Sequence, residues 1–378
     1  MKLRTIVKIA ITSSVVLLCA GFALYSFFRL SAAEGKKDFN LYELVPPSAS
    51  AVFVTDDILE FVAEVDDLAC SKNQQYLHVS KLFSYLKQYL YTLQEEAPHG
   101  LSRQMNQMLI SFHEPDNIHN QVLYCRLGEG DRQLIDRFVQ KYVSSLYPPK
   151  TFKYKGEDIT IYPMADGDFL ACYLTSDFMA LSYQKKLIEQ VIDAVKDQKS
   201  LRDDSVFAAI HQPKAANFIT IYGRTSAIPL LSREDCHSWS EYDIHLNSEV
   251  FYLSGQMYAS SSCMERTLEG IHALPVTEES DSLLVVAGTE KVDSCISRVA
   301  ASPSHSLFDE CVSNLSREAC YIMVADMDKV YISPEKYASY LPPFIIRHSD
   351  LFRPFILSVQ LTEVGNRLSH IFVFTYKD

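Results

Sequence analysis

The chain has 378 residues, of which 48% are hydrophobic, and its 47 acidic and 35 basic residues give a formal net charge of −12. This balance argues against partners that need clustered lysine and arginine, namely nucleic acids and anionic membrane surfaces. The length is sufficient for one large domain or for two domains of ordinary size.

The first element is an uncharged run over residues 9–28. A helix of this length is about 30 Å long, which matches the hydrocarbon core of a bilayer. Three basic residues and no acidic one precede the run, so the positive-inside rule predicts a cytoplasmic N-terminus and an exported remainder. We expect residues 1–33 to be a cytoplasmic tip and a transmembrane signal-anchor in the inner membrane, with the C-terminal part in the periplasm.

Cleavage of this segment is the alternative to a retained anchor. Residues 31–33, Ser-Ala-Ala, supply the small side chains of a cleavage site. A secretory signal, however, has an apolar stretch of only about 7 to 15 residues, so the length favours retention.

A polar tether is predicted over residues 34–45, and its reach is about 40 Å at most. A Pro-Pro pair ends the tether because it forces extended backbone. The apolar run 51–55 then predicts a short strand, and two aspartates open a helix, since acidic residues in a first turn complement the helix dipole.

The next elements alternate between helical and strand-like periodicity. Leucines at helical spacing predict a helix over residues 77–93, and short strand-like runs over 159–183 predict a meander followed by a helix over 185–196. Strands mixed with helices, without regular βαβ alternation, indicate an α+β fold with antiparallel sheets and packed helices. A further helix is predicted over residues 131–146 by an apolar stripe that consists of Leu134, Ile135, Phe138, Val139, Tyr142, Val143 and Leu146.

The second part of the chain repeats the order of elements in the first. This order predicts two related α+β halves, a first domain over residues 46–270 and a second, shorter domain over residues 271–378. Chance similarity among short apolar strands is the alternative. The strand at 51–54 corresponds to that at 282–288, and a helix follows each, at 290–298 in the second half. The strand at 217–222 corresponds to that at 320–325. The segments 249–253 and 255–258 correspond to the two strands of a hairpin at 355–361 and 368–376.

Three features occur together: the N-terminal anchor, the Leu-Val-Pro-Pro opening at residues 44–47, and the segment Ser200–Ile210 directly after a strand and a helix. In combination they resemble a family of single-pass, N-terminally anchored envelope proteins of Gram-negative bacteria that is catalogued only as a domain of unknown function. The resemblance spans residues 41–378 and is most specific over 180–222. It implies an envelope location and a duplicated α+β architecture, and it implies no activity, catalytic residue or ligand.

Eight cysteines follow the anchor, an even number that permits disulfides in an exported chain. Eight cysteines allow 105 complete pairings, so the sequence assigns none. Cys125 and Cys172 lie in strand-like runs, where a cross-strand bridge is conceivable, but buried free thiols are the favoured interpretation. The spacing of redox and zinc sites, C-x-x-C, does not occur.

The densest group of metal-ligand side chains is formed by His113, Glu114, Asp116 and His119. Imidazoles and carboxylates are ordinary zinc ligands, but Pro115 excludes the helical geometry of the H-E-x-x-H motif. The spacing matches no known site, so a solvated loop is the preferred interpretation.

Other motifs are weaker. Gly128-Glu-Gly130-Asp131 follows a strand and opens a helix, as a phosphate-binding turn would, but the third glycine is missing and Asp131 as a helix cap explains the same residues. Two Ser-x-x-Lys pairs, one at residues 84–87 and one at 182–185, lack the partner motifs of a serine nucleophile.

We therefore predict no catalytic, metal-binding or cofactor-binding residue and no cofactor. The expected function is that of a membrane-anchored, periplasm-facing, non-catalytic protein that binds or scaffolds an envelope protein partner and does not bind nucleic acid. The alternative is an anchored periplasmic hydrolase or metal-dependent enzyme with a site near His113 and His119.

Overall fold

The chain divides into two compact units, Met1–Asn40 and Leu41–Asp378, and only the second is considered below. The computed structural model describes residues 40–67, 103–113, 117, 119–128, 131–138, 147–164, 167–210, 219–224, 229, 236–247, 249–274, 278–280, 282–303, 306–365 and 367–377. The expected helices over 9–28 and 77–93 lie outside these residues. No helix within the described ranges has both the length and the apolar character needed to cross a membrane.

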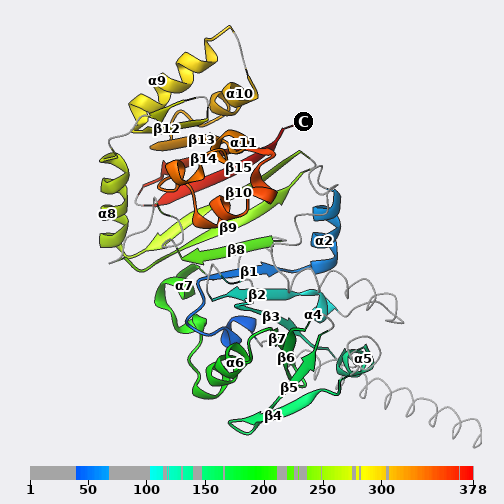
Figure 1. The fold of residues 1–378 in the computed structure, drawn as a ribbon. Helices are drawn as coiled ribbons and strands as arrows, with labels where there is room; N and C mark the ends of the chain where they lie inside the picture. Colours follow the sequence, from blue (N-terminus) through cyan, green and yellow to red (C-terminus); the bar gives the residue numbers. More distant parts are fainter. Residues whose placement is uncertain are drawn as a thin grey trace, which may run out of the picture. The chain divides into compact units, whose positions relative to one another are not determined.

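The described strands form one 15-stranded sheet in which neighbouring strands are antiparallel (Figure 1). Their order across the sheet is β11-β12-β13-β14-β15-β10-β9-β8-β1-β2-β3-β7-β6-β5-β4. The predicted α+β class with an antiparallel sheet is thus confirmed. The strands are β1 Ala51–Thr55, β2 Met108–Phe112, β3 Gln121–Arg126, β4 Lys150–Tyr154, β5 Glu157–Pro163, β6 Phe169–Leu174, β7 Phe178–Ser182, β8 Ile219–Arg224, β9 Ser238–Leu246, β10 Val250–Ala259, β11 Glu278–Glu279, β12 Leu283–Ala287, β13 Tyr321–Asp326, β14 Phe355–Glu363 and β15 Leu368–Tyr376.

Helices cover both faces of this sheet. α2 and α5 share a buried cluster with β1, β2 and β3, and α9 and α10 pack on one face of β12, β13 and β14. The opposite face of these last strands is covered by α8 and α11 to α13. The helices are η1 Leu41–Leu44, α2 Ile58–Asp67, α4 Arg103–Asn106, α5 Asp131–Phe138, α6 Lys185–Asp197, η5 Leu201–Asp203, α7 Ser205–Ile210, α8 Ser261–His272, α9 Thr289–Ala300, α10 Leu307–Ser313, α11 Met327–Val330, η8 Pro334–Tyr337, α12 Pro343–Arg347 and α13 Ser349–Phe352.

Most local predictions within the described ranges are confirmed. The strand at 51–55, the helix after it, the meander of β5, β6 and β7, and the helix α6 all form where the periodicity places them. α5 begins at Asp131, with Leu134 and Ile135 buried. The rest of its predicted stripe, from Phe138 onwards, lies outside the side chains that the structure describes.

Two local predictions differ from the structure. Residues 41–45, assigned to the tether, belong to the folded unit, because η1 packs against α6 and both Leu44 and Val45 are fully buried. Residues 249–253 and 255–258, expected as two segments like the C-terminal hairpin, fall on the single strand β10 from Val250 on, and its hairpin partner is β9. Gly255 does not interrupt β10, because it pairs within the ladder opposite Tyr242 and His370.

Two groups of four strands pair in the same succession. β1, β8, β9 and β10 are consecutive neighbours, as are β12, β13, β14 and β15. The groups meet where β10 pairs with β15, so the sheet is continuous across residue 270, which itself lies in α8. The domain division at residue 270 stays a prediction.

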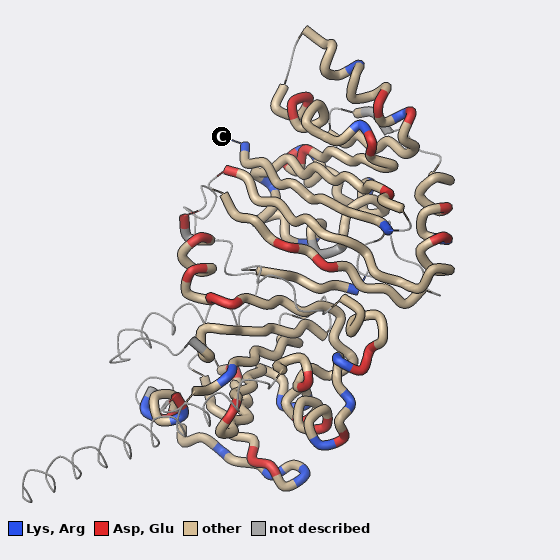
Figure 2. The backbone as a smooth tube through the Cα atoms, turned by 180° about the vertical axis from the view of Figure 1, so that it is seen from behind, with Lys and Arg blue, Asp and Glu red and all other residues tan. Residues whose placement is uncertain are grey.

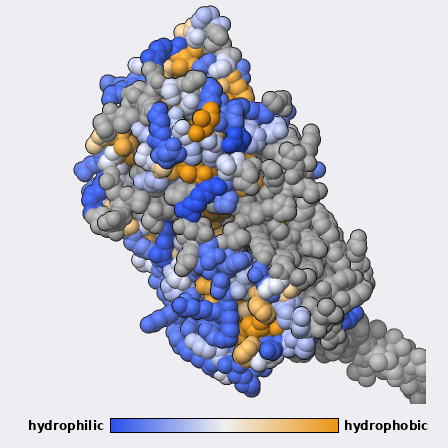
Figure 3. Space-filling view, in the orientation of Figure 1, coloured by the Kyte–Doolittle hydropathy of each residue, from blue (hydrophilic) through white to orange (hydrophobic). Residues whose placement is uncertain are grey.

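The surface agrees with the acidic composition. α2 carries four acidic and no basic residues, and Figure 2 shows this run of negative charge along the helix. On the face in Figure 3, hydrophilic side chains dominate the described surface and hydrophobic ones form separate spots. Isolated spots of this kind are usual on proteins, so an exposed apolar residue has meaning only with a second observation.

Candidate functional site

The two histidines of the predicted loop face different partners. His113 lies between two hydroxyls, with Ser111 Oγ 2.9 Å from Nε2 and Ser48 Oγ 3.1 Å from Nδ1. Burial lowers the pKa of His113 to about 4, so the ring is neutral near pH 7. His119 Nε2 instead lies 3.7 Å from Asp168 Oδ2.

Glu114 and Asp116 lie outside the described residues, so the full predicted set cannot be placed. Within the described ranges, no group of three or more His, Cys, Asp or Glu side chains is arranged to hold a metal ion. The alternative of a metal-dependent enzyme near His113 and His119 therefore stays a prediction.

The polar groups of the other weak motifs bind to residues of the same chain. The Gly128 amide donates to Asp131 Oδ2 at 2.7 Å, so a carboxylate takes the position that a phosphate would need. Ser182 Oγ donates to the Gln121 carbonyl at 2.7 Å, and Lys185 pairs with Glu189. The second Ser-x-x-Lys pair, at residues 84–87, lies outside the described ranges.

The cysteines are used in two ways. Cys236 and Cys263 form a disulfide with a Cα–Cα distance of 5.5 Å, a pairing that the sequence left open. Cys125 and Cys172 are free and buried, so the conceivable cross-strand bridge between them is not formed. Burial raises the pKa of each of these two thiols to about 12, which keeps them protonated and unreactive.

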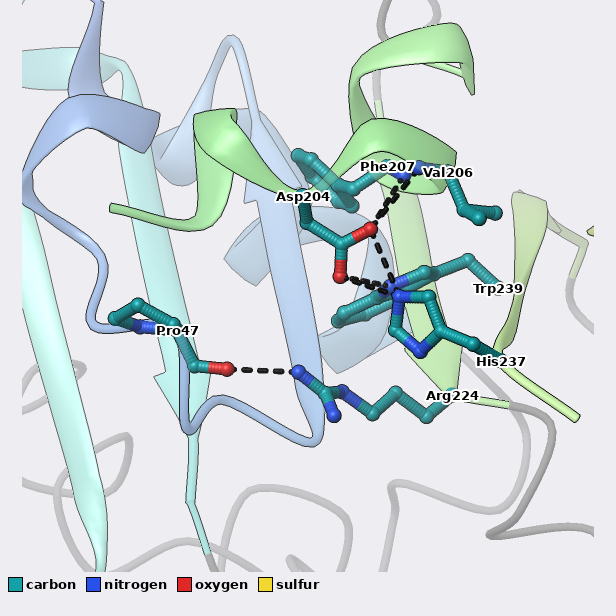
Figure 4. Close-up of polar contacts among 7 residues, drawn as sticks. All are labelled: Pro47, Asp204, Val206, Phe207, Arg224, His237 and Trp239. Carbon is teal, nitrogen blue, oxygen red and sulfur yellow. Dashed lines mark hydrogen bonds and ion pairs between the residues drawn. The ribbon is translucent and has the colours of Figure 1, made fainter. Parts of the chain in front are cut away.

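A polar centre forms around Asp204, which lies in the segment singled out by the resemblance (Figure 4). Its carboxylate accepts hydrogen bonds from the backbone amides of Val206 and Phe207 at 3.0 and 3.1 Å. It also accepts from Trp239 Nε1 at 3.1 Å and from His237 Nε2 at 2.8 Å. One side chain thus caps the start of α7 and ties it to the beginning of β9.

The charge of Asp204 is stabilised by these donors. Burial alone would raise the pKa of this carboxyl, but the hydrogen bonds from His237, the Phe207 amide and Trp239 outweigh it and lower the pKa. His237 remains half exposed, whereas Trp239 is fully buried. The arrangement orients a half-exposed histidine against a largely buried carboxylate.

The same segment fixes the start of the folded unit. The Leu201 amide donates to the Val45 carbonyl at 2.8 Å, and Arg202 forms an ion pair with Glu43. Tyr42 packs its ring 5.4 Å from that of Phe207. These contacts pin η1 onto η5 and α7.

The end of β8 provides a further attachment for the N-terminal segment. Arg224 Nη2 donates to the Pro47 carbonyl at 2.7 Å, and its guanidinium lies 5.2 Å from the centre of the Trp239 ring (Figure 4). The Arg224 amide donates to the Ser50 carbonyl at 3.0 Å. Residues 45–50 are therefore held along the edge of this polar centre.

A cleft of about 800 Å³ lies elsewhere in the same unit. It is bounded by the starts of α10, β10 and β14, by α11, by the ends of β13 and β15, and by Ser280 between β11 and β12. Its lining combines the apolar side chains of Leu307, Phe308 and Ile356 with the pair of Asp326 and Lys377, whose Oδ1 and Nζ atoms are 2.7 Å apart. This volume is within the range of about 300 to 1,000 Å³ that is usual for ligand sites.

Comparison of the chain with models of known families, with characterised proteins and with solved structures found no match. The resemblance to anchored envelope proteins thus stays a prediction.

Sequence reasoning pointed to the segment around Asp204 but not to its partners, and it missed the cleft entirely. His237 and Trp239 are more than thirty positions away from Asp204 in the sequence, and nothing in their local pattern marks the contact. A repeated Ser-Leu-x-Asp sequence, at residues 200–203 and 306–309, is the signal that could have connected the two sites.

Proposed function

We propose that this chain is a single-pass inner-membrane protein whose periplasmic α+β part binds or scaffolds another component of the cell envelope. The observation that carries the proposal is the pinning of residues 41–47 to η5, α7 and β8. Residues 29–40 separate the uncharged run at 9–28 from the compact unit that begins at Leu41, so a spacer of at most about 40 Å would hold this unit near the bilayer. A short, firmly attached spacer suits a protein that presents a binding surface at the membrane.

The bonded pair Cys236–Cys263 supports the exported location. Disulfides persist in the periplasm and are rare in the cytosol, where thiols are kept reduced.

The cleft supports a binding role for this part of the chain. It brings apolar side chains and a charged pair together in one concavity, as ligand sites do.

The proposal includes a duplicated origin for the two halves. The succession β1-β8-β9-β10 corresponds to β12-β13-β14-β15. In each half a Ser-Leu-x-Asp capping box follows a helix, precedes a strand and starts a short helical segment. The preceding helices also share their buried positions, counted from the N-cap: Ile188, Val191 and Ile192 in α6 and Val292, Cys295 and Ile296 in α9.

Fusion of alkaline phosphatase after residue 377 tests the location. The fused enzyme is active only in the periplasm, so we expect activity in intact cells and a membrane-bound protein that retains residues 1–33. Fluorescence from a reporter that matures only in the cytoplasm, fused at the same position, would contradict the proposal. So would a mature protein that begins near Ala33 and is released from membranes without detergent.

Crosslinking in intact membranes followed by purification tests the binding role. We expect a reproducible envelope protein in the crosslinked material and its absence without crosslinker. Recovery of the chain alone, with efficient crosslinking of a known envelope complex in the same sample, argues against scaffolding.

A further inference from the structure

The two Ser-Leu-x-Asp segments have different surroundings. In the first, Leu201 is 0% exposed, because residues 41–47 lie against it and its amide donates to the Val45 carbonyl. In the second, the corresponding Leu307 is 38% exposed and lines the 800 Å³ cleft. Residues 41–47 cover the first segment, whereas the residues that the structure describes leave Leu307 of the second partly exposed.

The neighbouring strand ends show the same difference. β8 ends at Arg224, which binds the Pro47 carbonyl of the covering stretch. The corresponding strand β13 ends at Asp326, which lies in the cleft and pairs with Lys377. A polar side chain is thus present at both strand ends: that of Arg224 binds the covering stretch, and that of Asp326 pairs with Lys377.

The two halves differ in the described residues Glu278 and Glu279, a few positions before β12. In the first half, the residues before β1 run past η5 and the end of β8. In the second half, Glu278 and Glu279 form β11, which pairs with β12 at the edge of the sheet. Ser282 keeps the contact that Ser50 makes, because the Asp326 amide donates to its carbonyl at 2.9 Å, and Ser280 lines the cleft. Upstream of Ser280 the described residues Glu278 and Glu279 pair with β12 at the sheet edge and do not line the cleft.

We infer that the cleft bounded by Leu307, Ile356, Asp326 and Lys377 is a binding groove for a short extended peptide segment of a partner protein. The segment would lie as residues 41–47 lie in the first half, with an apolar side chain over Leu307 and its backbone beside the Asp326–Lys377 pair. This inference rests on the proposed binding function and names the class of partner. Its occupant has the chemistry of the internal covering stretch, in which apolar residues precede a proline.

The probe is a fluorescent synthetic peptide with the sequence of residues 40–49, added to the full chain in lipid nanodiscs. We expect saturable binding measured by fluorescence anisotropy, and a loss of affinity of about tenfold or more in Leu307→Asp, since a charge replaces the apolar contact. Val364→Asp is the matched control, because Val364 is an exposed apolar residue in the turn at the opposite end of the β14–β15 hairpin. Circular dichroism confirms that both variants are folded.

A second peptide, with aspartate at the positions of Leu44 and Val45, should not bind. Absence of saturable binding by the first peptide would overturn the inference, and so would equal affinities of Leu307→Asp and Val364→Asp. Concentration-dependent dimerisation that the peptide cannot compete with would assign the cleft to a second copy and also overturn it. None of these results depends on the reporter fusions, so failure of the groove and failure of the envelope location are distinguishable.

Discussion

Gly255 lies in β10 where the neighbouring strand leaves no room for a side chain. A Cβ at this position would meet the Glu241 carbonyl oxygen at 1.7 Å, a backbone atom that cannot rotate away. Gly255→Ala should therefore destabilise the fold by about 3 kcal/mol or more, because overpacking here forces the strands apart. Gly223→Ala is the control, since Gly223 is also in a strand and has nothing within 4 Å of its Cβ position. Urea unfolding of both variants measures the difference, and similar midpoints would contradict the packing.

His370 makes stability depend on pH. It is fully buried, its Nε2 lies 3.0 Å from the Glu241 carbonyl, and burial lowers its pKa from 6.5 to about 4. Between these two pH values the unfolded chain binds a proton that the folded chain does not, so the free energy of unfolding falls as the pH falls. The loss from this residue should be about 2 kcal/mol at pH 5 relative to pH 7.5.

His370→Gln isolates this contribution. The amide can still donate to the Glu241 carbonyl but does not titrate, so the variant should lose less stability on acidification than the unaltered chain. His113 also has a lowered pKa, but it is present in both proteins. The difference between their losses of stability on acidification therefore reports on His370. Urea unfolding at pH 7.5 and pH 5 measures it, and equal losses would refute the assignment.

The segment that carries Asp204 stabilises the fold as an element rather than as a single contact. Asp204→Ala removes the acceptor for two backbone amides, for His237 and for the buried indole of Trp239. Loss of a helix cap together with an unsatisfied buried donor should cost about 2 to 4 kcal/mol. Glu310→Ala, at the corresponding and exposed position of α10, should change stability by about 0.5 kcal/mol or less. Thermal unfolding of the two variants tests this, and equal effects would contradict the role of Asp204.

At the scale of elements, the sequence predicted what depends on neighbouring residues. The stripe of Ile188, Val191 and Ile192 predicts α6 because a buried helix face repeats every three to four residues, and the alternation in β5 to β7 predicts the meander in the same way. The failures at η1 and β10 have one cause. η1, which carries the buried Leu44, contacts α6, η5 and β3, and Gly255 packs on β9, so both depend on contacts far away in the sequence.

At the scale of the whole folded unit, strand order was beyond prediction from sequence. β1 pairs with β2 on one side and with β8 on the other, although β8 begins more than 160 positions later. Hydrophobic periodicity reports that a strand is buried but not which strand lies beside it. The candidate cleft was beyond prediction for the same reason, because its walls come from segments around residues 249, 307, 326 and 376 that are distant in the sequence.

The shared core leads to a prediction about unfolding of the chain as a whole. Met257, Met264 and Leu268, which precede residue 270, belong to the same buried cluster as Leu357 and Phe374, and β10 pairs with β15 across that position. Separating residues 41–270 from 271–378 would expose this apolar surface and leave an unpaired strand edge on each fragment. We therefore expect the two halves, despite their proposed common origin, to unfold together.

Calorimetry of the full chain in nanodiscs tests this expectation. One transition should account for residues 41–378. Gly255→Ala, which lies in the first half, should lower the melting temperature of the C-terminal strands by as much as that of the strands around residue 255. Hydrogen exchange of β13 and β14 reports on the second half separately. If exchange in these strands is unchanged in the variant while β9 and β10 lose protection, the halves are independent domains and the continuous sheet does not couple them.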